Sequence, residues 1–592
     1  MAARKIIVVG GGLAGLAAVI KIAEAGGTVD LFSIVPVKRS HSVCAQGGIN
    51  AAKDLKGEGD STAQHFDDTI YGGDFLANQT PVKAMCEAAP AIIDLLDRMG
   101  VPFNRTPEGL LDFRRFGGTL YQRTAFAGAT TGQQLLYALD EQVRRYESEG
   151  KVKKYEGWEF LSAIIDGKGV ARGIVAMNLR SMEVIPFAAD AIILATGGNG
   201  AIFGKSTNSV VCTGSAQSAV FQQGVYYANG EFIQVHPTCI PGEDKLRLMS
   251  ESARGEGGRV WVPRTPGDKR DLKAIPESER FYFLEEWYPK YGNLVPRDVA
   301  TRAIHKVVYE LGLGIDGQPM VYLDLTHIDR ATLDRKLGGI LEIYEKFVGV
   351  DPHDEPMKIF PGMHYTMGGI WVDFNQMTNV PGIFAAGECE YQYHGANRLG
   401  ANSLVSCIYG GFQAGPNAVR YAKSLPAAEG DGGAAAEIAR QAEINAKLLK
   451  NEGTENPFRL WRELGETMTE HVTVIRYNKG LKKADDKIVE LLERYKKVNL
   501  SDRSQWTNTS FAFARQLKNM LELARTVALG ALLRDESRGA HYKPDFPDRN
   551  DERFLKTSKA SFTDAQEGPK IEYEEVDTQY IKPRPRRYDA TK

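Results

Sequence analysis

The sequence predicts an α/β protein in which a parallel sheet is joined to an inserted α+β domain and a C-terminal helical domain. A glycine-rich turn near the start lies between a short apolar run and a helical pattern. Two later apolar runs also end in glycine, and beyond residue 437 the apolar residues recur at the spacing of amphipathic helices. Together these patterns are typical of a ligand-binding sheet with helices on its faces.

The first 32 residues predict a βαβ unit, with strands at 5–9 and 28–32 and a helix at 13–25. Gly10, Gly12 and Gly15 stand in the turn between the first strand and the helix. They allow a tight turn, a close approach of a pyrophosphate, and close packing of the helix on the strand. The helix N-terminus would then face the phosphates. We therefore expect a Rossmann-like dinucleotide site.

Two later strands are predicted to join the same sheet. Residues 189–195 end in Thr196-Gly197-Gly198, and residues 382–386 end in Gly387-Glu388. Such ends place both segments at the carboxyl edge of one sheet, around one cofactor. The acid that binds ribose in many NAD sites is replaced by Ser33, because Asp30 comes too early. Glu388 is the alternative candidate for the ribose, and the segment around it favours FAD over NAD.

The chain is predicted to divide into four parts. Residues 1–236 and 355–423 form the FAD-binding domain, and residues 237–354, rich in proline, charge and aromatic residues, form a capping domain with a helix at 299–311. Residues 424–436 are a low-complexity linker. Residues 437–540 form a helical domain, with helices at 486–498 and 511–533. Residues 541–592 are expected to be a tail that lies on a neighbouring surface.

Composition excludes several classes of protein. The 592 residues are 43% hydrophobic and 25% charged, with a net charge of −2, which disfavours nucleic-acid binding. The six cysteines lack the spacing of zinc or iron–sulfur ligands, so reduced thiols are expected, and any clusters would belong to another subunit. We expect no signal peptide, no transmembrane helix, and membrane attachment only through a partner.

His41 lies in a loop soon after the glycine turn, between Ser40 and Ser42 and ahead of Gly47-Gly48. A histidine in this place could be bonded covalently to the cofactor. Spacing alone leaves the commoner alternative open, which is a polar loop histidine near the cofactor. A covalent histidyl flavin usually has a raised potential, which suits the oxidation of a difficult, unactivated substrate.

A series of motifs occurs in order along essentially the whole chain. They are the His41 segment, His236-Pro237-Thr238, residues 250–258, Pro296-Arg297-Asp298, residues 364–369, residues 394–400, Ser537-Arg538-Gly539-Ala540-His541 and Asp545-Phe546-Pro547-Asp548-Arg549. Together they closely resemble the flavoprotein subunits of succinate dehydrogenase and fumarate reductase. The sequence of residues 32–44 is most similar to that of the bacterial menaquinone-linked succinate dehydrogenases, in which Ser33 is also usual.

The resemblance implies a set of site residues. Ser250 stands where relatives often have Thr, which keeps the hydroxyl, and Ala401 stands where a relative has Gly. FAD would be held by an 8α-histidyl bond to His41. The substrate-binding residues would be His236, Ser250, His364 and Arg398, and the catalytic residues Arg297, Glu251 and Arg254. The cofactor-binding residues would be Gly10, Gly12, Gly15, Ser40, His41, Ser42, Gly47, Gly48, Thr196, Gly197, Gly198, Glu388, Asn402 and Ser403. No structural metal is expected.

These residue types suit a small dianion such as succinate, which needs cationic and hydrogen-bond donors at both ends. His236 and His364 lie near the two ends of the capping domain, where closure would exclude water. The resemblance implies hydride transfer between a substrate carbon and flavin N5, with Arg297 moving the proton. An arginine acting as a base must be transiently neutral, at roughly 1.4 kcal/mol per pKa unit. The simpler alternative for Arg297 is a salt bridge to Asp298 or Glu251.

The resemblance also implies partners and rivals. An iron–sulfur subunit and a cytochrome b membrane anchor with haem would carry electrons to menaquinone, with this chain peripheral on the cytoplasmic face of the bacterial membrane. Succinate oxidation is the expected direction. Fumarate reduction uses the same site and stays open, and L-aspartate oxidase is a more remote alternative that lacks the histidyl bond. A monovalent cation near Met367 and Glu388 also stays open.

Overall fold

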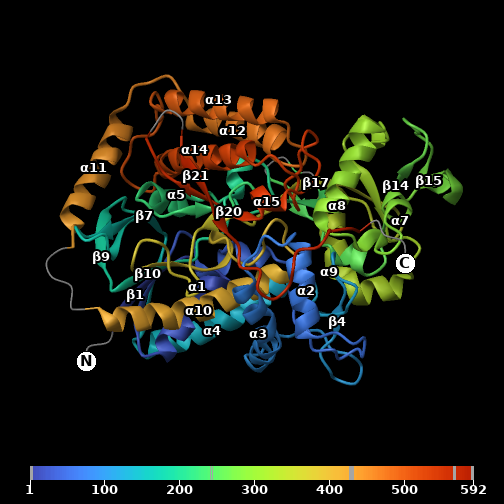
Figure 1. The fold of residues 1–592 in the computed structure, drawn as a ribbon, viewed down its shortest axis with the longest axis horizontal. Coiled ribbons are helices and arrows are strands. Elements are labelled where there is room, and N and C mark those ends of the chain that lie inside the picture. Colours follow the sequence, from blue (N-terminus) through green and yellow to red (C-terminus); the bar gives the residue numbers. More distant parts are fainter. Residues whose placement is uncertain (1–3, 241, 243–244, 426–431, 565–567, 589–592) are drawn as a thin grey trace.

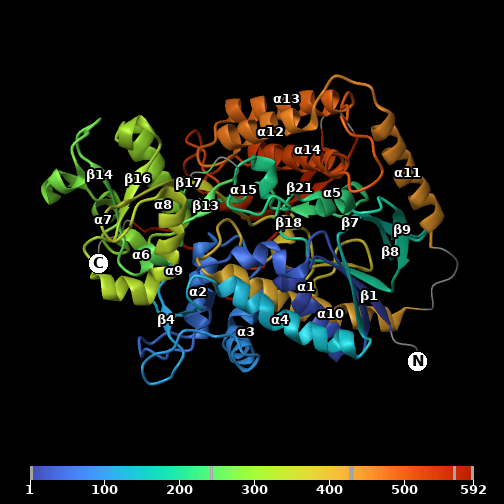
Figure 2. The same ribbon diagram turned by 180° about the vertical axis from the view of Figure 1, so that it is seen from behind.

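The computed structural model describes residues 4–588 except 241, 243–244, 426–431 and 565–567. Part of the predicted linker therefore lies outside the described residues. Five regions are arranged around one central sheet (Figures 1 and 2). The capping region lies at one end, and helices from the later part of the chain form an outer layer along one side and down the opposite end.

The central sheet is parallel and has the order β19-β10-β1-β2-β6. The sequence prediction of one sheet from strands far apart in the chain is confirmed. The alternate residues of β1 face opposite ways. Ile6 and Val8 pack with α1, α4 and α10, and Ile7 and Val9 pack against the sheet of β7, β8 and β9. The bounds are β1 Lys5–Val9, β2 Thr28–Ser33, β6 Val152–Glu156, β10 Ala191–Leu194, β19 Ile383–Ala385, β7 Trp158–Ile165, β8 Ala171–Asn178 and β9 Val184–Ala188.

Helices cover the first face of this sheet closely. Residues of α1 are nearly all buried, and a Cβ atom added at Gly411 of α10 would lie 2.4 Å from the Ala14 carbonyl oxygen of α1. Small residues therefore let these two helices touch backbone to backbone. The helices on this side and the short strands beside them are α1 Leu13–Glu24, α2 Thr62–Gly72, α3 Gln79–Arg98, α4 Thr131–Ser148, α10 Asn402–Ser424, β3 Ile49–Asn50, β4 Phe113–Arg114 and β5 Thr124–Ala125.

The capping region has its own sheet, of order β13-β12-β17-β16-β14-β15. Strands β12 and β17 pair antiparallel. Strand β12 runs across the predicted domain limit at residues 236 and 237, and β17 begins just after the limit at residue 354, so this ladder joins the cap to the rest. The predicted helix at 299–311 is α8, continued by a π-helical turn over Lys306–Glu310. The bounds are β12 Ile233–Ile240, β13 Arg247–Leu248, β14 Arg259–Pro263, β15 Arg280–Phe281, β16 Val321–Asp324, β17 Met357–Thr366, α6 Ser252–Gly255, α7 Phe283–Trp287, α8 Arg297–His305 and α9 Arg330–Val348.

The outer layer is helical, as the amphipathic spacing indicates. The structure extends the predicted 486–498 helix back to residue 478, and the longer helix begins at residue 509. The apolar faces of α12, α13 and α14 share one core with β7, β8 and β17. The bounds are α11 Ala434–Lys450, α12 Pro457–Val472, α13 Asn478–Tyr495, α14 Thr509–Leu533, and, next to this layer, α5 Ser215–Gln222.

The described part of the predicted tail, residues 541–588 except 565–567, has more regular structure than a polar tail would. It contains α15 Asp551–Phe554 and a hairpin of β20 Lys556–Ser561 and β21 Lys570–Glu575, which extends a sheet with β11 Tyr227–Ala228 and β18 Gly369–Ile370. Arg586 then reaches the cap, where it donates two hydrogen bonds of 2.6 and 3.0 Å to Asp298. Within the described residues, no helix is long and apolar enough to cross a membrane.

Candidate active site

A cavity of about 570 Å³ opens along the carboxyl edge of the central sheet and continues under the cap. It brings together residues from the glycine turn, the His41 loop, β10, β12, β17 and the start of α8. Most of the predicted site residues line it. They are Gly10, Gly12, Ser40, His41, Ser42, Gly47, Gly48, Thr196, Gly197, His236, Ser250, Glu251, Arg297, His364, Glu388, Arg398 and Ser403.

Four predicted residues lie behind the cavity wall. Arg254 contacts Glu251, and a Cβ atom added at Gly198 would lie 2.4 Å from a carboxylate oxygen of Glu388. Asn402 belongs to a buried network in which its amide oxygen meets Asn50 and His65, at 2.7 and 2.9 Å. Gly15 packs the helix on the strand, as predicted. These residues shape the wall without lining it.

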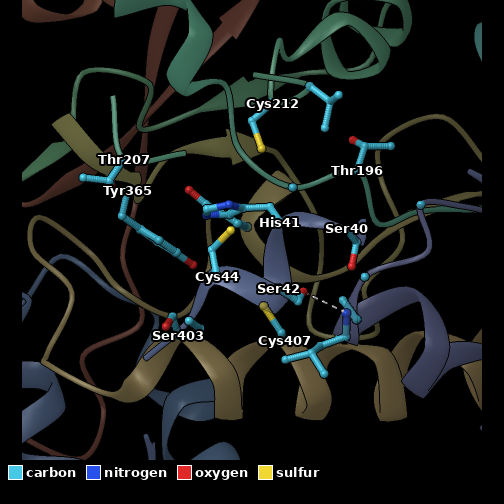
Figure 3. A pocket seen from close by; sticks show the side chains of 18 of the residues that line it. Ser40, His41, Ser42, Cys44, Thr196, Thr207, Cys212, Tyr365, Ser403 and Cys407 are labelled. Atoms are coloured by element: carbon cyan, nitrogen blue, oxygen red, sulfur yellow. Dashed lines mark hydrogen bonds between the residues drawn. The ribbon is translucent and has the colours of Figure 1, made fainter. Parts of the chain in front are cut away.

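The glycine turn has the geometry that a pyrophosphate site needs. Gly10 has a φ of +115°, and a Cβ atom there would lie 2.1 Å from the Ala195 carbonyl oxygen. At Gly15 a Cβ atom would lie 1.9 Å from the Gly10 carbonyl oxygen. Helix α1 starts at Leu13, whose backbone N–H donates to Ser42 Oγ at 3.2 Å (Figure 3). The positive end of the helix dipole thus faces the cavity.

The residues present fit a flavin dinucleotide. The hydroxyls of Ser40 and Thr196 are buried and have no hydrogen-bond partner among the described residues. They lie on the same side of the cavity, near Ser42 and the α1 N-terminus (Figure 3). Buried hydroxyls without partners are costly unless a ligand satisfies them. Backbone donors and hydroxyls at a helix N-terminus suit phosphate oxygens, which is the donor set that a pyrophosphate requires.

His41 lies in the middle of the cavity, between the Ser40 side and Tyr365 (Figure 3). The backbone N–H of Ser209 donates to its Nδ1 at 3.1 Å, and the side-chain amide of Asn208 lies 3.2 Å from its Nε2. Burial, helped by the charge of Lys245, lowers the pKa of His41 to about 4. The imidazole is therefore neutral at physiological pH.

Two arginines meet under the cap and share one acceptor. Arg297, the first residue of α8, and Arg398 donate to the same side-chain oxygen of Gln234, at 2.9 and 3.0 Å. Burial, followed by the charge of Arg297, lowers the pKa of Arg398 to about 9. The Arg398 Nε has no partner among the described residues. Two cations held side by side, one with a free donor, form a strong anion site.

Neutral donors complete this end of the cavity. The rings of His236 and His364 are 5.0 Å apart, on the paired strands β12 and β17. The backbone N–H of Thr238 donates to His236 Nδ1 at 3.2 Å, so the ring hydrogen of a neutral His236 is on Nε2, which has no partner among the described residues. The Ser250 hydroxyl also lines the cavity.

Glu251 connects Arg297 to Arg254. Its Oε2 accepts from Arg297 at 2.8 and 2.9 Å, and its Oε1 accepts from Arg254 at 2.7 Å. Burial raises the pKa of Glu251, but the two guanidinium groups outweigh burial and hold it below its usual value. The carboxylate is thus ionised. Asp298, the other predicted partner of Arg297, instead pairs with Arg302 and Arg586.

Gln234 is a site residue that the sequence did not reveal. Its amide group accepts from both arginines and donates to Asn397 Oδ1 and to the Arg398 carbonyl, at 2.9 and 2.8 Å. One signal was available, because residues 234 and 236 share a side of an alternating strand. A lone glutamine in an apolar strand gave no reason to use that signal.

Comparisons with known proteins agree with this arrangement. A family model described as "FAD binding domain" matches residues 5–404, and one described as "Fumarate reductase flavoprotein C-term" matches residues 461–588. The chain is 63% identical to the succinate dehydrogenase flavoprotein subunit of Bacillus subtilis, over 100% of both chains.

Solved structures of relatives have the same fold. The flavoprotein of Escherichia coli quinol fumarate reductase, carrying a Glu-to-Gln mutation, superposes with a TM-score of 0.91 at 32% identity, over 100% of this chain and 99% of that one. A quinol–fumarate reductase with menaquinol molecules gives 0.89 at 33% identity, over 99% and 100%. The chain therefore belongs to the FAD-binding family of succinate dehydrogenase and fumarate reductase flavoprotein subunits.

Proposed function

We propose that this chain is the catalytic flavoprotein of a succinate dehydrogenase and oxidises succinate to fumarate. The observation that carries the proposal is the donor set under the cap. Arg297, Arg398, His236, His364 and Ser250 line one end of the cavity that the glycine turn opens. Two guanidinium groups and three neutral donors match the two carboxylates of a short dianion.

Different residues bind the substrate and transfer the proton. Bound FAD would supply the acceptor for the hydride that leaves one substrate carbon. Arg398 and the histidines hold the carboxylates. Arg297 takes the proton from the neighbouring carbon. Glu251 and Arg254 continue the chain of contacts and are placed to carry that proton away. The cap excludes water from these charges, which strengthens each interaction.

The direct test is succinate oxidation by the purified chain with an artificial electron acceptor. We expect turnover with succinate and little with L-aspartate, which an L-aspartate oxidase would oxidise. Fumarate reduction is the second candidate, because the same residues serve both directions and solved relatives carry that name. Relative rates with quinone and quinol separate the two. Failure to oxidise succinate while reducing fumarate would overturn the proposed direction.

We also propose the 8α-histidyl bond to His41, through Nε2. Donors face both ring nitrogens, and a neutral imidazole carries one hydrogen, so it cannot accept at both. A neutral ring bonded to the flavin through Nε2 has no hydrogen on either nitrogen, so Nδ1 can still accept from the Ser209 backbone N–H. Asn208 then retains its other acceptor, the His364 carbonyl, at 2.8 Å.

We infer that electrons leave through an iron–sulfur subunit and a membrane cytochrome b anchor with haem to menaquinone, on the cytoplasmic face of the membrane. Support comes from the solved relatives, which are named as quinol–fumarate reductases, one of them with menaquinol. Copurification from membranes with an iron–sulfur protein and haem tests this inference. Recovery of the chain without either partner would contradict it.

Changing Gln234 to leucine should lower kcat/KM for succinate about 10- to 100-fold with flavin content unchanged. The change removes the side-chain oxygen that accepts from both Arg297 and Arg398, so the two like charges lose their common acceptor. Steady-state kinetics measures the effect. Gln441→Leu is the matched control, because Gln441 is a buried glutamine that bonds Ser162 away from the cavity. Equal kinetics in both variants would contradict the role of Gln234 in positioning the two arginines.

The KM for succinate should stay nearly constant between pH 6.5 and 8. Burial, followed by the charge of Arg297, lowers the pKa of His236 and of His364 well below 6.5, so both stay neutral across this range. If either ring bound as a cation with an ordinary pKa, its protonated fraction and the affinity would fall roughly tenfold over this window. A rise of that size in KM would contradict the neutral-donor assignment.

A further inference from the structure

The end of the cavity far from the dicarboxylate residues has a carboxyl group of its own. Of the described residues that line the cavity, three are acidic, namely Glu159, Glu251 and Glu388. Glu251 is engaged by two arginines, and Glu388 Oε1 accepts from the backbone N–H of Thr366 at 3.1 Å. Both carboxylates therefore already accept hydrogen bonds from the protein.

Only one carboxylate oxygen of Glu159 has a hydrogen-bond partner among the described residues. Glu159 is 5% exposed, and its Oε1 accepts from the side-chain amide of Gln516 at 2.9 Å. Its Oε2 has no hydrogen-bond partner among the described residues. Burial raises the pKa of Glu159 to about 7 and outweighs the lowering effects of the Gln516 hydrogen bond and of the Arg515 charge. A buried carboxyl oxygen without a partner is costly unless a ligand supplies a donor.

The position of Glu159 is that of a nucleoside-binding residue. It lies in β7, two residues after Gly157, whose backbone N–H donates to the Ser33 carbonyl at 2.8 Å. The end of β2 is where the nucleoside half of a dinucleotide lies in this type of sheet. Ser33 stands there in place of an acid, and its hydroxyl already donates to the Val35 carbonyl at 2.6 Å.

Helix α14 reaches the same end of the cavity. Gln516 lines the cavity beside Glu159, and one turn later Asn519 donates to Ser215 Oγ at 2.8 Å. Ser215 also lines the cavity and begins α5. The outer helical layer is thus in direct contact with the nucleotide region, although the predicted domain limits assign it to a separate domain.

We propose that Glu159, positioned by Gln516, accepts a hydrogen bond from the adenosine half of FAD. The inference relies on FAD occupying this cavity. The groups that a carboxyl acceptor suits are the ribose hydroxyls and the adenine amino group. Phosphate oxygens are acceptors and anions, so Glu159 does not bind the pyrophosphate. Glu159 then takes over the role at the ribose that the sequence suggested for Glu388.

The test measures cofactor affinity rather than activity, in full-length chains that carry His41→Ser so that FAD exchanges freely. Adding Glu159→Gln should weaken FAD binding about tenfold, which is the effect of one hydrogen bond to a charged group. Binding of FMN, which lacks adenosine, should not change. No loss with FAD, or an equal loss with FMN, would overturn the proposal.

Two analogues identify the donor. If the ribose is bound, the effect of Glu159→Gln should vanish with a 2′,3′-dideoxyadenosine analogue of FAD. If the amino group is bound, the effect should vanish with the hypoxanthine analogue. Either outcome supports the proposal. An effect that persists with both analogues overturns it.

Controls separate binding from folding. Glu183→Gln changes an exposed carboxylate in the loop between β8 and β9 and should leave the affinity for FAD unchanged. Gln516→Leu removes the donor that holds Glu159 and should also weaken FAD but not FMN, which keeps the test valid if Glu159→Gln does not fold. A lower unfolding temperature of the apo chain with unchanged FAD affinity would show a structural role alone. Failure of the covalent proposal is seen separately, as FAD release from the unmodified chain.

Discussion

Replacing Arg297 with glutamine should reduce succinate turnover on the order of 10³-fold while the flavin stays bound. Positioned proton transfer contributes roughly 10²- to 10⁴-fold to a rate, and this guanidinium is the one that reaches both the cavity and Glu251. Glutamine keeps a polar group at the start of α8 but cannot take up and release the proton. The expected loss therefore appears in kcat as well as in kcat/KM.

Changing Arg297 to lysine should reduce succinate turnover almost as much. Arg297 donates through Nε and one terminal nitrogen to Glu251 and through the other to Gln234, a fork that an ammonium group cannot reproduce. Steady-state rates with an artificial acceptor measure the loss, and flavin absorbance confirms that the cofactor is retained.

The control for position 297 lies on the same helix. Arg302 is a guanidinium whose bonds go to Asp298 and to the Gly539 carbonyl, away from the cavity. Arg302→Gln should keep near-normal turnover. Turnover near that of the unmodified chain in Arg297→Gln would remove Arg297 from the mechanism and would leave the salt bridge to Glu251 as its whole role.

The glycine turn, the first strands and helix, and the shared sheet could be predicted because each depends on a local pattern. Gly10 and Gly15 stand where a side chain would collide with the backbone, so the glycines in the sequence directly indicate the geometry of the turn. The pairing of β20 with β11 depends instead on a partner more than 300 residues away. The polar sequence of β20 gives no sign of that pairing.

Contacts between distant segments also position the residues of the site, and local sequence patterns do not predict them. The change of composition near residue 237 suggested a domain limit, but β12 continues through it because its pairing with β17 extends on both sides. That ladder is what brings His236 and His364 within 5.0 Å. Gln234 acts only through its distance to two arginines from other elements, and Glu159 through a glutamine of α14. Contacts of this kind follow from tertiary structure, not from spacing.

Changing His41 to serine should release the flavin from the denatured polypeptide. In the unmodified chain, flavin fluorescence should migrate with the protein after unfolding, because the proposed bond through Nε2 would survive denaturation. His327→Ser, which changes an exposed histidine outside the cavity, should leave that fluorescence in place. Free flavin from the unmodified chain would falsify the covalent assignment directly.

The same variant tests the direction of the reaction. Serine removes the bond but leaves the glycine turn, the unpartnered hydroxyls of Ser40 and Thr196, and the arginines under the cap, so FAD should still bind. Loss of the histidyl bond lowers the flavin potential, which disfavours taking a hydride from succinate more than giving one to fumarate. We expect succinate oxidation to fall by more than fumarate reduction, measured with dyes of suitable potential. Equal losses in both directions would mean that the bond at His41 secures the cofactor without setting its potential.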